Sequence, residues 1–119
     1  MARSAKTVSI RHLHAAVKTA LEAAKRQHPD FKIDPVAASG TVILPIYVRF
    51  PWICGLPPFP WPESELQNIT AFTDSFVANL ASNEHISSAA LDGKFERTVY
   101  ASGGTVTIGF VPADFSLTE

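Results

Sequence analysis

The chain is short of the residue types that most often reveal an activity. It has a single cysteine, Cys54, and therefore cannot form an internal disulfide. It also lacks the Gly-x-x-x-x-Gly-Lys, Gly-x-Gly-x-x-Gly and Gly-x-Ser-x-Gly patterns of phosphate loops, dinucleotide sites and nucleophile elbows. No motif assigns a reaction or a ligand, and we expect no cofactor.

Long apolar runs of the kind that cross a bilayer are missing too. The uncharged run at residues 36–48 contains Gly40 and Pro45 and is too short to span a membrane as a helix. Behind Arg3 and Lys6 there is no apolar stretch of the kind that a signal peptide needs. We therefore expect a cytoplasmic protein without membrane contact.

Charge is scarce as well, and it is unevenly distributed. Charged residues make up 18% and hydrophobic residues 46% of 119 residues, which predicts one folded domain spanning 1–119. Seven of the ten Lys and Arg residues lie at or before Lys32, so the rest of the chain is acidic. The sequence pI near 6.4 disfavours nucleic-acid binding. Two halves, or two subunits, of opposite charge explain the asymmetry without another partner.

Two stretches have the apolar period of a helix. The first covers residues 9–28, with Ser9 as its N-cap and Pro29 after its end. The second covers 62–81, with Pro62 at the first helical position and Glu63 and Glu65 in the first turn. The expected buried stripes are Ile10, Leu13, Val17, Ala20, Leu21 and Ala24 in the first helix, and Leu66, Ile69, Phe72, Phe76, Val77 and Leu80 in the second.

Three stretches have the period of a strand. Residues 41–50 alternate, and Pro45 predicts that this strand lies at a sheet edge or carries a bulge. Residues 94–101 and 104–111 form a C-terminal hairpin around Gly103 and Gly104. The predicted fold is α+β, with two helices packed against a three- to four-stranded, mainly antiparallel sheet.

The titratable residues are dispersed. On a helix, the pair His12 and His14 would diverge by about 200°, with His12 pointing outward and His14 bordering the buried stripe, so no metal site is expected. Cys54 has no second cysteine two residues on and no adjacent base, and we expect its thiol to be chemically passive.

The most unusual segment is residues 50–62, called the arm below. It contains five prolines and both tryptophans, so its backbone is stiff and its surface is apolar. The arm could fold back over the open sheet face and cover Ile43 and Tyr47, form a subunit interface, or line an apolar pocket. Its candidate binding residues are Trp52, Ile53, Leu56, Phe59 and Trp61.

These alternatives correspond to different functions. We expect a small non-catalytic interaction protein that acts as a homodimer through the arm. The alternative is a small-molecule-binding protein, or an acid/base enzyme, with an apolar pocket between sheet and arm. Its ligand would be a small apolar molecule, contacted by Tyr47, Arg49, His14 or His85. Binding is preferred because the groups that could carry catalysis do not cluster in the sequence.

Overall fold

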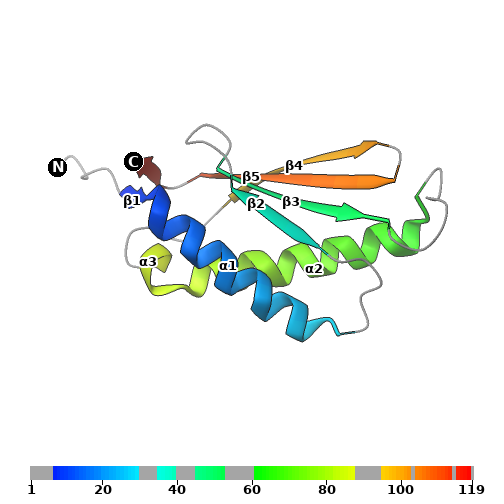
Figure 1. The fold of residues 1–119 in the computed structure, drawn as a ribbon, viewed down its shortest axis with the longest axis horizontal. Helices are drawn as coiled ribbons and strands as arrows, with labels where there is room; N and C mark the ends of the chain where they lie inside the picture. Colours follow the sequence, from blue (N-terminus) through cyan, green and yellow to red (C-terminus); the bar gives the residue numbers. More distant parts are fainter. Residues whose placement is uncertain are drawn as a thin grey trace.

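A helical layer covers one face of an antiparallel sheet in the computed structural model, which describes residues 7–29, 35–39, 45–52, 61–87, 95–102, 104–113 and 115–118 (Figure 1). The described helices are α1 (Ile10–Gln27), α2 (Glu63–Ser82) and α3 (Glu84–Ser87). The described strands are β1 (Thr7–Ser9), β2 (Val36–Ser39), β3 (Ile46–Pro51), β4 (Phe95–Ser102), β5 (Thr105–Pro112) and β6 (Ser116–Thr118). The predicted α+β class is confirmed.

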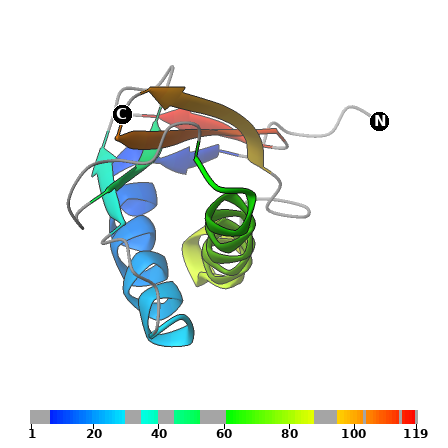
Figure 2. The same cartoon turned by 90° about the vertical axis from the view of Figure 1, so that its right-hand side faces the viewer.

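The main sheet has four strands in the order β2-β3-β5-β4, and every neighbouring pair is antiparallel. Seen end-on, the helices lie beneath one face of this sheet (Figure 2). A second, two-stranded sheet pairs β1 with β6 in parallel, next to the start of α1. Neither this parallel pair nor β2 is predicted by the local sequence pattern.

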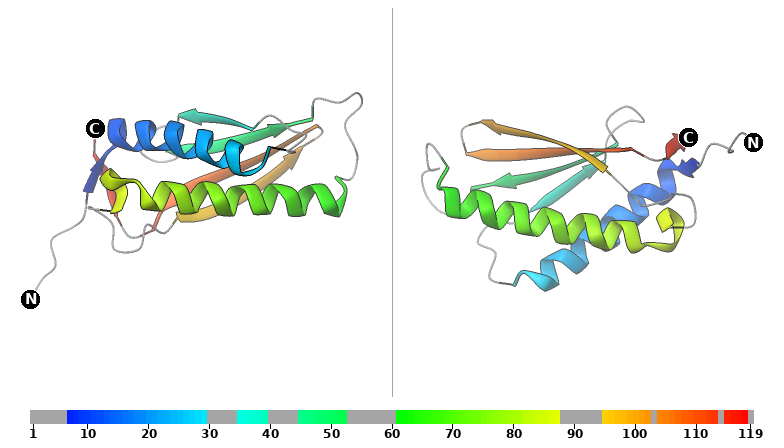
Figure 3. Two further views of the ribbon diagram at one scale, coloured as in Figure 1. Left: turned by 90° about the horizontal axis from the view of Figure 1, so that it is seen from below. Right: turned by 180° about the vertical axis from the view of Figure 1, so that it is seen from behind.

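α1 forms where the pattern predicts it. The Ser9 side chain accepts a hydrogen bond from the Arg11 amide (3.3 Å), which satisfies one of the free N–H groups at the helix start. His28 caps the other end. The buried residues of α1 are Leu13, Ala16, Val17, Ala20 and Ala24. The alanines among them allow α2 to pack alongside (Figure 3).

α2 also agrees with its predicted range, with two differences. Pro62 is the N-cap, with φ −58° and ψ 141°, and the helix begins at Glu63. The apolar period predicts that Leu66 is buried, but it is 38% exposed, and Ile69 is the first buried position of α2. The buried residues of α2 are Ile69, Phe72, Thr73, Phe76 and Leu80.

Pro45 predicts an edge strand or a bulge, and the edge-strand alternative is wrong. β3 begins at Ile46 and lies between β2 and β5, while residues 41–44 lie outside the described residues. Pro45 directly precedes the first paired residue, so its missing N–H removes no hydrogen bond from the ladder. A central strand therefore tolerates this proline.

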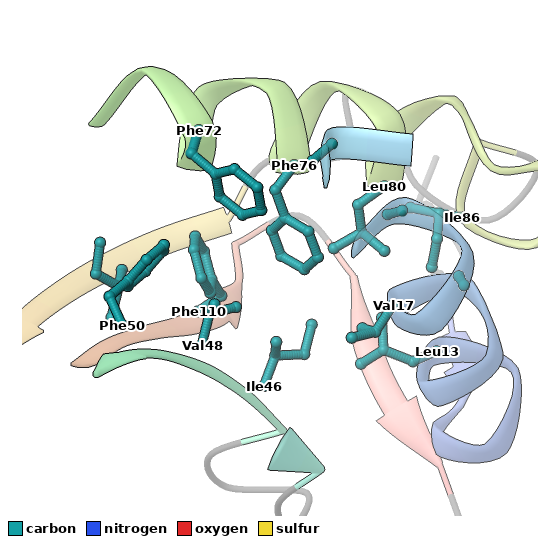
Figure 4. Close-up of a cluster of buried hydrophobic side chains, with 14 of the residues drawn as sticks. Leu13, Val17, Ile46, Val48, Phe50, Phe72, Phe76, Leu80, Ile86 and Phe110 are labelled. Carbon is teal, nitrogen blue, oxygen red and sulfur yellow. The ribbon is translucent and has the colours of Figure 1, made fainter. Parts of the chain in front are cut away.

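The core lies between the sheet and the two long helices (Figure 4). Phe50 of β3 meets Phe72 of α2 edge-on, with ring centroids 5.6 Å apart. Phe110 of β5 meets Phe76 at 5.4 Å. Side chains from β3 and β5 thus point toward the helices, and the alternate positions of these strands face the opposite side, called the outer face below.

Candidate functional site

The described ends of the arm pack onto the core. Trp61 is 8% exposed, Trp52 is half-buried against the core, and their rings meet edge to face with centroids 5.7 Å apart. The Trp52 amide donates to the Gly104 carbonyl (2.7 Å), which ties the start of the arm to the hairpin turn. Three candidate binding residues, Ile53, Leu56 and Phe59, lie outside the described residues, as does Cys54.

Tyr47 and Arg49 lie on the outer face of β3. Their neighbours Ile46, Val48 and Phe50 are buried toward the helices, whereas Tyr47 is half-buried and Arg49 is exposed. The sheet register places Arg49 between Val36 of β2 and Thr107 of β5. A row of residues therefore crosses the outer face at the level of Arg49.

A shallow hollow lies beside Arg49. It has a volume of about 140 Å³ and is lined by Val36, Arg49, Pro51 and Thr105. Pro51 and Thr105 are partners in the β3–β5 register, and both point to the outer face. The lining of the hollow thus combines a valine and a proline with one threonine and one arginine.

The free edge of β4 is a feature that the sequence interpretation missed. β4 is the last strand of the main sheet, and within the described residues no strand pairs with its outer edge. Residues 96–101 are all exposed, and Val99 and Tyr100 are 60% and 61% exposed. Because neighbouring residues of a strand point to opposite faces, two large apolar side chains in a row indicate a strand with no fully polar face. This pair of neighbouring apolar residues is the feature of the sequence that could have indicated the exposed edge.

The two charged residues of β4, Glu96 and Arg97, point to opposite faces of the sheet. The Arg97 guanidinium donates to the Asp74 carboxylate of α2 at 2.6 Å, so it is held toward the helical layer. Glu96 lies on the opposite, outer face, across from Val111 of β5. The second half of β4, from Thr98 to Ser102, carries no charge.

The histidines lie in the helical layer. The exposed rings of His12 and His85 stack with centroids 4.3 Å apart, which joins the start of α1 to α3. His14 is half-buried, and its Nε2 has no hydrogen-bond partner within the described part of the chain. His28 Nε2 lies 2.9 Å from Ser75 Oγ of α2. Across the described ranges, no three His, Cys, Asp or Glu side chains are grouped so that they could hold a metal ion.

The sheet separates the residues considered for acid/base chemistry. Tyr47 and Arg49 face outward from β3, while His14 and His85 belong to helices on the other side of the sheet. These four side chains cannot converge on one substrate. The arrangement instead offers two exposed features for binding, the hollow beside Arg49 and the free edge of β4.

Comparisons with family models, curated proteins and solved structures find no match to this chain. Among the helices of the described residues, none is long and apolar enough to cross a membrane.

Proposed function

We propose that the protein is a non-catalytic interaction protein that acts as a homodimer, in which β4 of one copy pairs antiparallel with β4 of a second copy. The observation that carries this proposal is the exposure of Val99 (60%) and Tyr100 (61%) on a strand with a free edge. The dimer would hold one continuous eight-stranded sheet. Both subunits would contribute the same surface, as in a two-fold interface.

The backbone of β4 supports this pairing. Every second residue of an edge strand directs its N–H and C=O groups away from the sheet, where they can bind another strand. β4 has eight residues, whereas the opposite edge strand, β2, has four. β4 therefore offers the longer template.

The side chains of β4 support the pairing from both faces. Val99 lies across from Ile108, on the face that points to the helices, and Tyr100 lies across from Thr107, on the outer face. A second copy paired with β4 would cover part of Val99 on one face of the sheet and part of Tyr100 on the other. Cross-strand apolar and aromatic pairs contribute roughly 0.2–1 kcal/mol each.

Charge also favours a second copy as the partner. In an antiparallel pair centred on Val99, Glu96 and Arg97 of one strand lie opposite the uncharged residues Ser102 and Ala101 of the other. No like charges oppose each other directly. Because Arg97 is held by Asp74, it is also turned away from the edge that it would otherwise protect.

The arm remains a second candidate surface for the same self-association. Trp61 and Trp52 already use apolar surface within the subunit. An interface formed by the arm would therefore depend on Trp52 and on residues 53–60 more than on Trp61. Substitutions at Trp52 and at Val99 distinguish the contribution of the arm to dimerisation from that of β4.

A charge-swap experiment tests the β4 pairing. Val99→Lys places two cations opposite each other at the centre of the pair and should weaken dimerisation at least about tenfold. Val99→Glu should do the same with two anions. An equimolar mixture of the two variants should form a heterodimer in sedimentation velocity, because the opposite charges then meet.

Leu66→Lys is the matched control, since Leu66 is an exposed apolar residue of α2 outside the edge. This variant should remain as dimeric as the wild type. A wild-type protein that stays monomeric at high concentration contradicts the proposal. A dimer that survives both Val99 variants and dissociates on Trp52→Ala would place the interface at the arm instead.

A further inference from the structure

We propose that the hollow beside Arg49 binds a small carboxylate that carries an apolar group. This site is independent of the self-association, because it lies over β2, β3 and β5 while the proposed dimer uses the edge of β4. The observation behind it is a hollow whose lining residues include one arginine and one threonine beside a valine and a proline.

The lining selects the charge of the ligand. Arg49 has no ion-pair partner among the described residues, and none of the four lining residues is acidic. In the described sheet the acid of the outer face is Glu96 on β4, whereas the register partners of Arg49 are Val36 and Thr107. The guanidinium of an arginine presents paired N–H donors whose geometry matches a carboxylate. The Thr105 hydroxyl adds one more donor.

The apolar walls of the hollow favour a ligand that carries a small apolar group next to its carboxylate. Val36 and Pro51 offer apolar walls, so a bare inorganic anion would leave half of the hollow unused. The volume of about 140 Å³ is close to that of an enclosed cavity of about 150 Å³ that holds one benzene ring, but this hollow is open to solvent on one side. Pockets for larger, drug-sized ligands measure about 300–1,000 Å³. A single ring or a short branched chain with one carboxylate therefore fits.

The walls of the hollow are already ordered. β3 is hydrogen-bonded on both sides, and Pro51 is held opposite Thr105 at the end of the ladder. Val36 and Thr105 are β-branched and Pro51 is cyclic, so these three side chains lose little freedom on binding. Arg49 is the one flexible element, and it carries the charge that recognises the ligand.

The test is a titration of the isotope-labelled full chain with sodium benzoate, and in parallel with the neutral analogue benzamide, at constant ionic strength. Benzoate should shift the amide signals of Val36, Arg49 and Thr105 saturably, with a Kd of about 1 mM. Benzamide should bind at least about tenfold more weakly because it lacks the charge.

Variants identify the charge that matters. Arg49→Gln should raise the Kd for benzoate about tenfold, and Thr105→Val should raise it by a smaller factor. Arg11→Gln is the matched control, since Arg11 is an exposed arginine of α1 on the other side of the sheet. That variant should bind benzoate as the wild type does.

A separate measurement identifies the source of the carboxylate. A tripeptide ending in phenylalanine with a free C-terminus, compared with its amidated form, reports whether a polypeptide end can supply the same group. Tighter binding of the free peptide than of benzoate points to a chain terminus, and weaker binding points to a free small acid. Equal binding of benzoate and benzamide, shifts that do not saturate, or an equal loss in Arg11→Gln overturns the proposal.

Discussion

β4 and β5 are the two strands of one hairpin, and each has eight residues, yet they are buried to very different degrees. In β5, Val106, Ile108 and Phe110 are 0%, 4% and 0% exposed. In β4, Val99 and Tyr100 are 60% and 61% exposed. Val99 faces Ile108 across the ladder, so a single strand spacing separates a buried side chain from an exposed one.

The difference between Val99 and Ile108 lies in the position of their strands, because both residues are apolar and β-branched. β5 pairs with β3 on one side and β4 on the other, and its Phe110 reaches Phe76 of α2. Among the described strands, β4 pairs with β5 alone, and its Arg97 forms an ion pair with Asp74 of α2. Val99 and Tyr100, which stay exposed at this edge, therefore gain little from folding of the monomer.

The largest expected effect comes from removing an aromatic side chain on β5. Phe110→Ala should lower the free energy of unfolding by about 3–5 kcal/mol, because it deletes a fully buried ring. Tyr100→Ala, the matched change on β4, should alter it by no more than about 0.5 kcal/mol. Urea denaturation at low protein concentration measures both. Similar losses would show that β4 is as important to the monomer as β5.

The two tryptophans at the ends of the arm extend the comparison. Trp61→Ala should cost about 3 kcal/mol of unfolding free energy because Trp61 belongs to the core. Trp52→Ala should cost less in folding and, if the arm joins two subunits, on the order of 2 kcal/mol in association. Urea denaturation and sedimentation equilibrium separate the two quantities. A larger folding loss for Trp52 than for Trp61 would reverse the assignment.

The same isosteric change, valine to threonine, at a buried and at an exposed position isolates the effect of burial on stability. Val106→Thr should lower stability by about 1–3 kcal/mol, because it places a hydroxyl in the core without adding a partner. Val99→Thr makes the same change on the same face of the sheet at an exposed position, and its effect should stay within about 0.5 kcal/mol. Thermal unfolding of both variants provides the measurement. Equal shifts in Tm would indicate that Val99 is also buried in solution.

The smallest expected effect concerns the ion pair that ties β4 to α2. Asp74→Asn should lower stability by about 0.2–1 kcal/mol, because the carboxylate is largely exposed and the attraction is screened by salt. The single variant Arg97→Gln and the double variant Asp74→Asn/Arg97→Gln complete a double-mutant cycle that isolates the coupling. High salt should reduce the coupling further, and a coupling that is insensitive to salt would argue against an ion pair.

The helices and the hairpin were predictable from the sequence because their determinants are local. The stripe of α1, its Ser9 cap and the acidic first turn of α2 act within a few residues. β1 and β6 pair residues that lie more than a hundred positions apart, and no periodicity reports such a contact. The edge-strand prediction from Pro45 failed for a similar reason. A proline removes a ladder hydrogen bond only when it lies within the paired part of a strand, and the local sequence does not show where pairing begins.

Tyr47 and Arg49 were chosen from the sequence, but for a pocket between the sheet and the arm. The alternation of β3 was sufficient to place both on one face. This face is the outer one because the helices pack on the other face. Val36 and Thr105 complete a hollow beside Arg49 because the strand order places β2 and β5 on either side of β3. The free edge of β4 was missed because the identity of the edge strand is a property of the whole sheet.

The fold class, both long helices and the C-terminal hairpin are encoded locally, because helix caps, apolar periods and turn residues act over short distances. Which strands are central, which face the helices cover and which apolar residues remain exposed are established when the elements pack together. These outcomes depend on pairings between distant segments, which form when the whole chain has folded and which no short stretch of residues encodes.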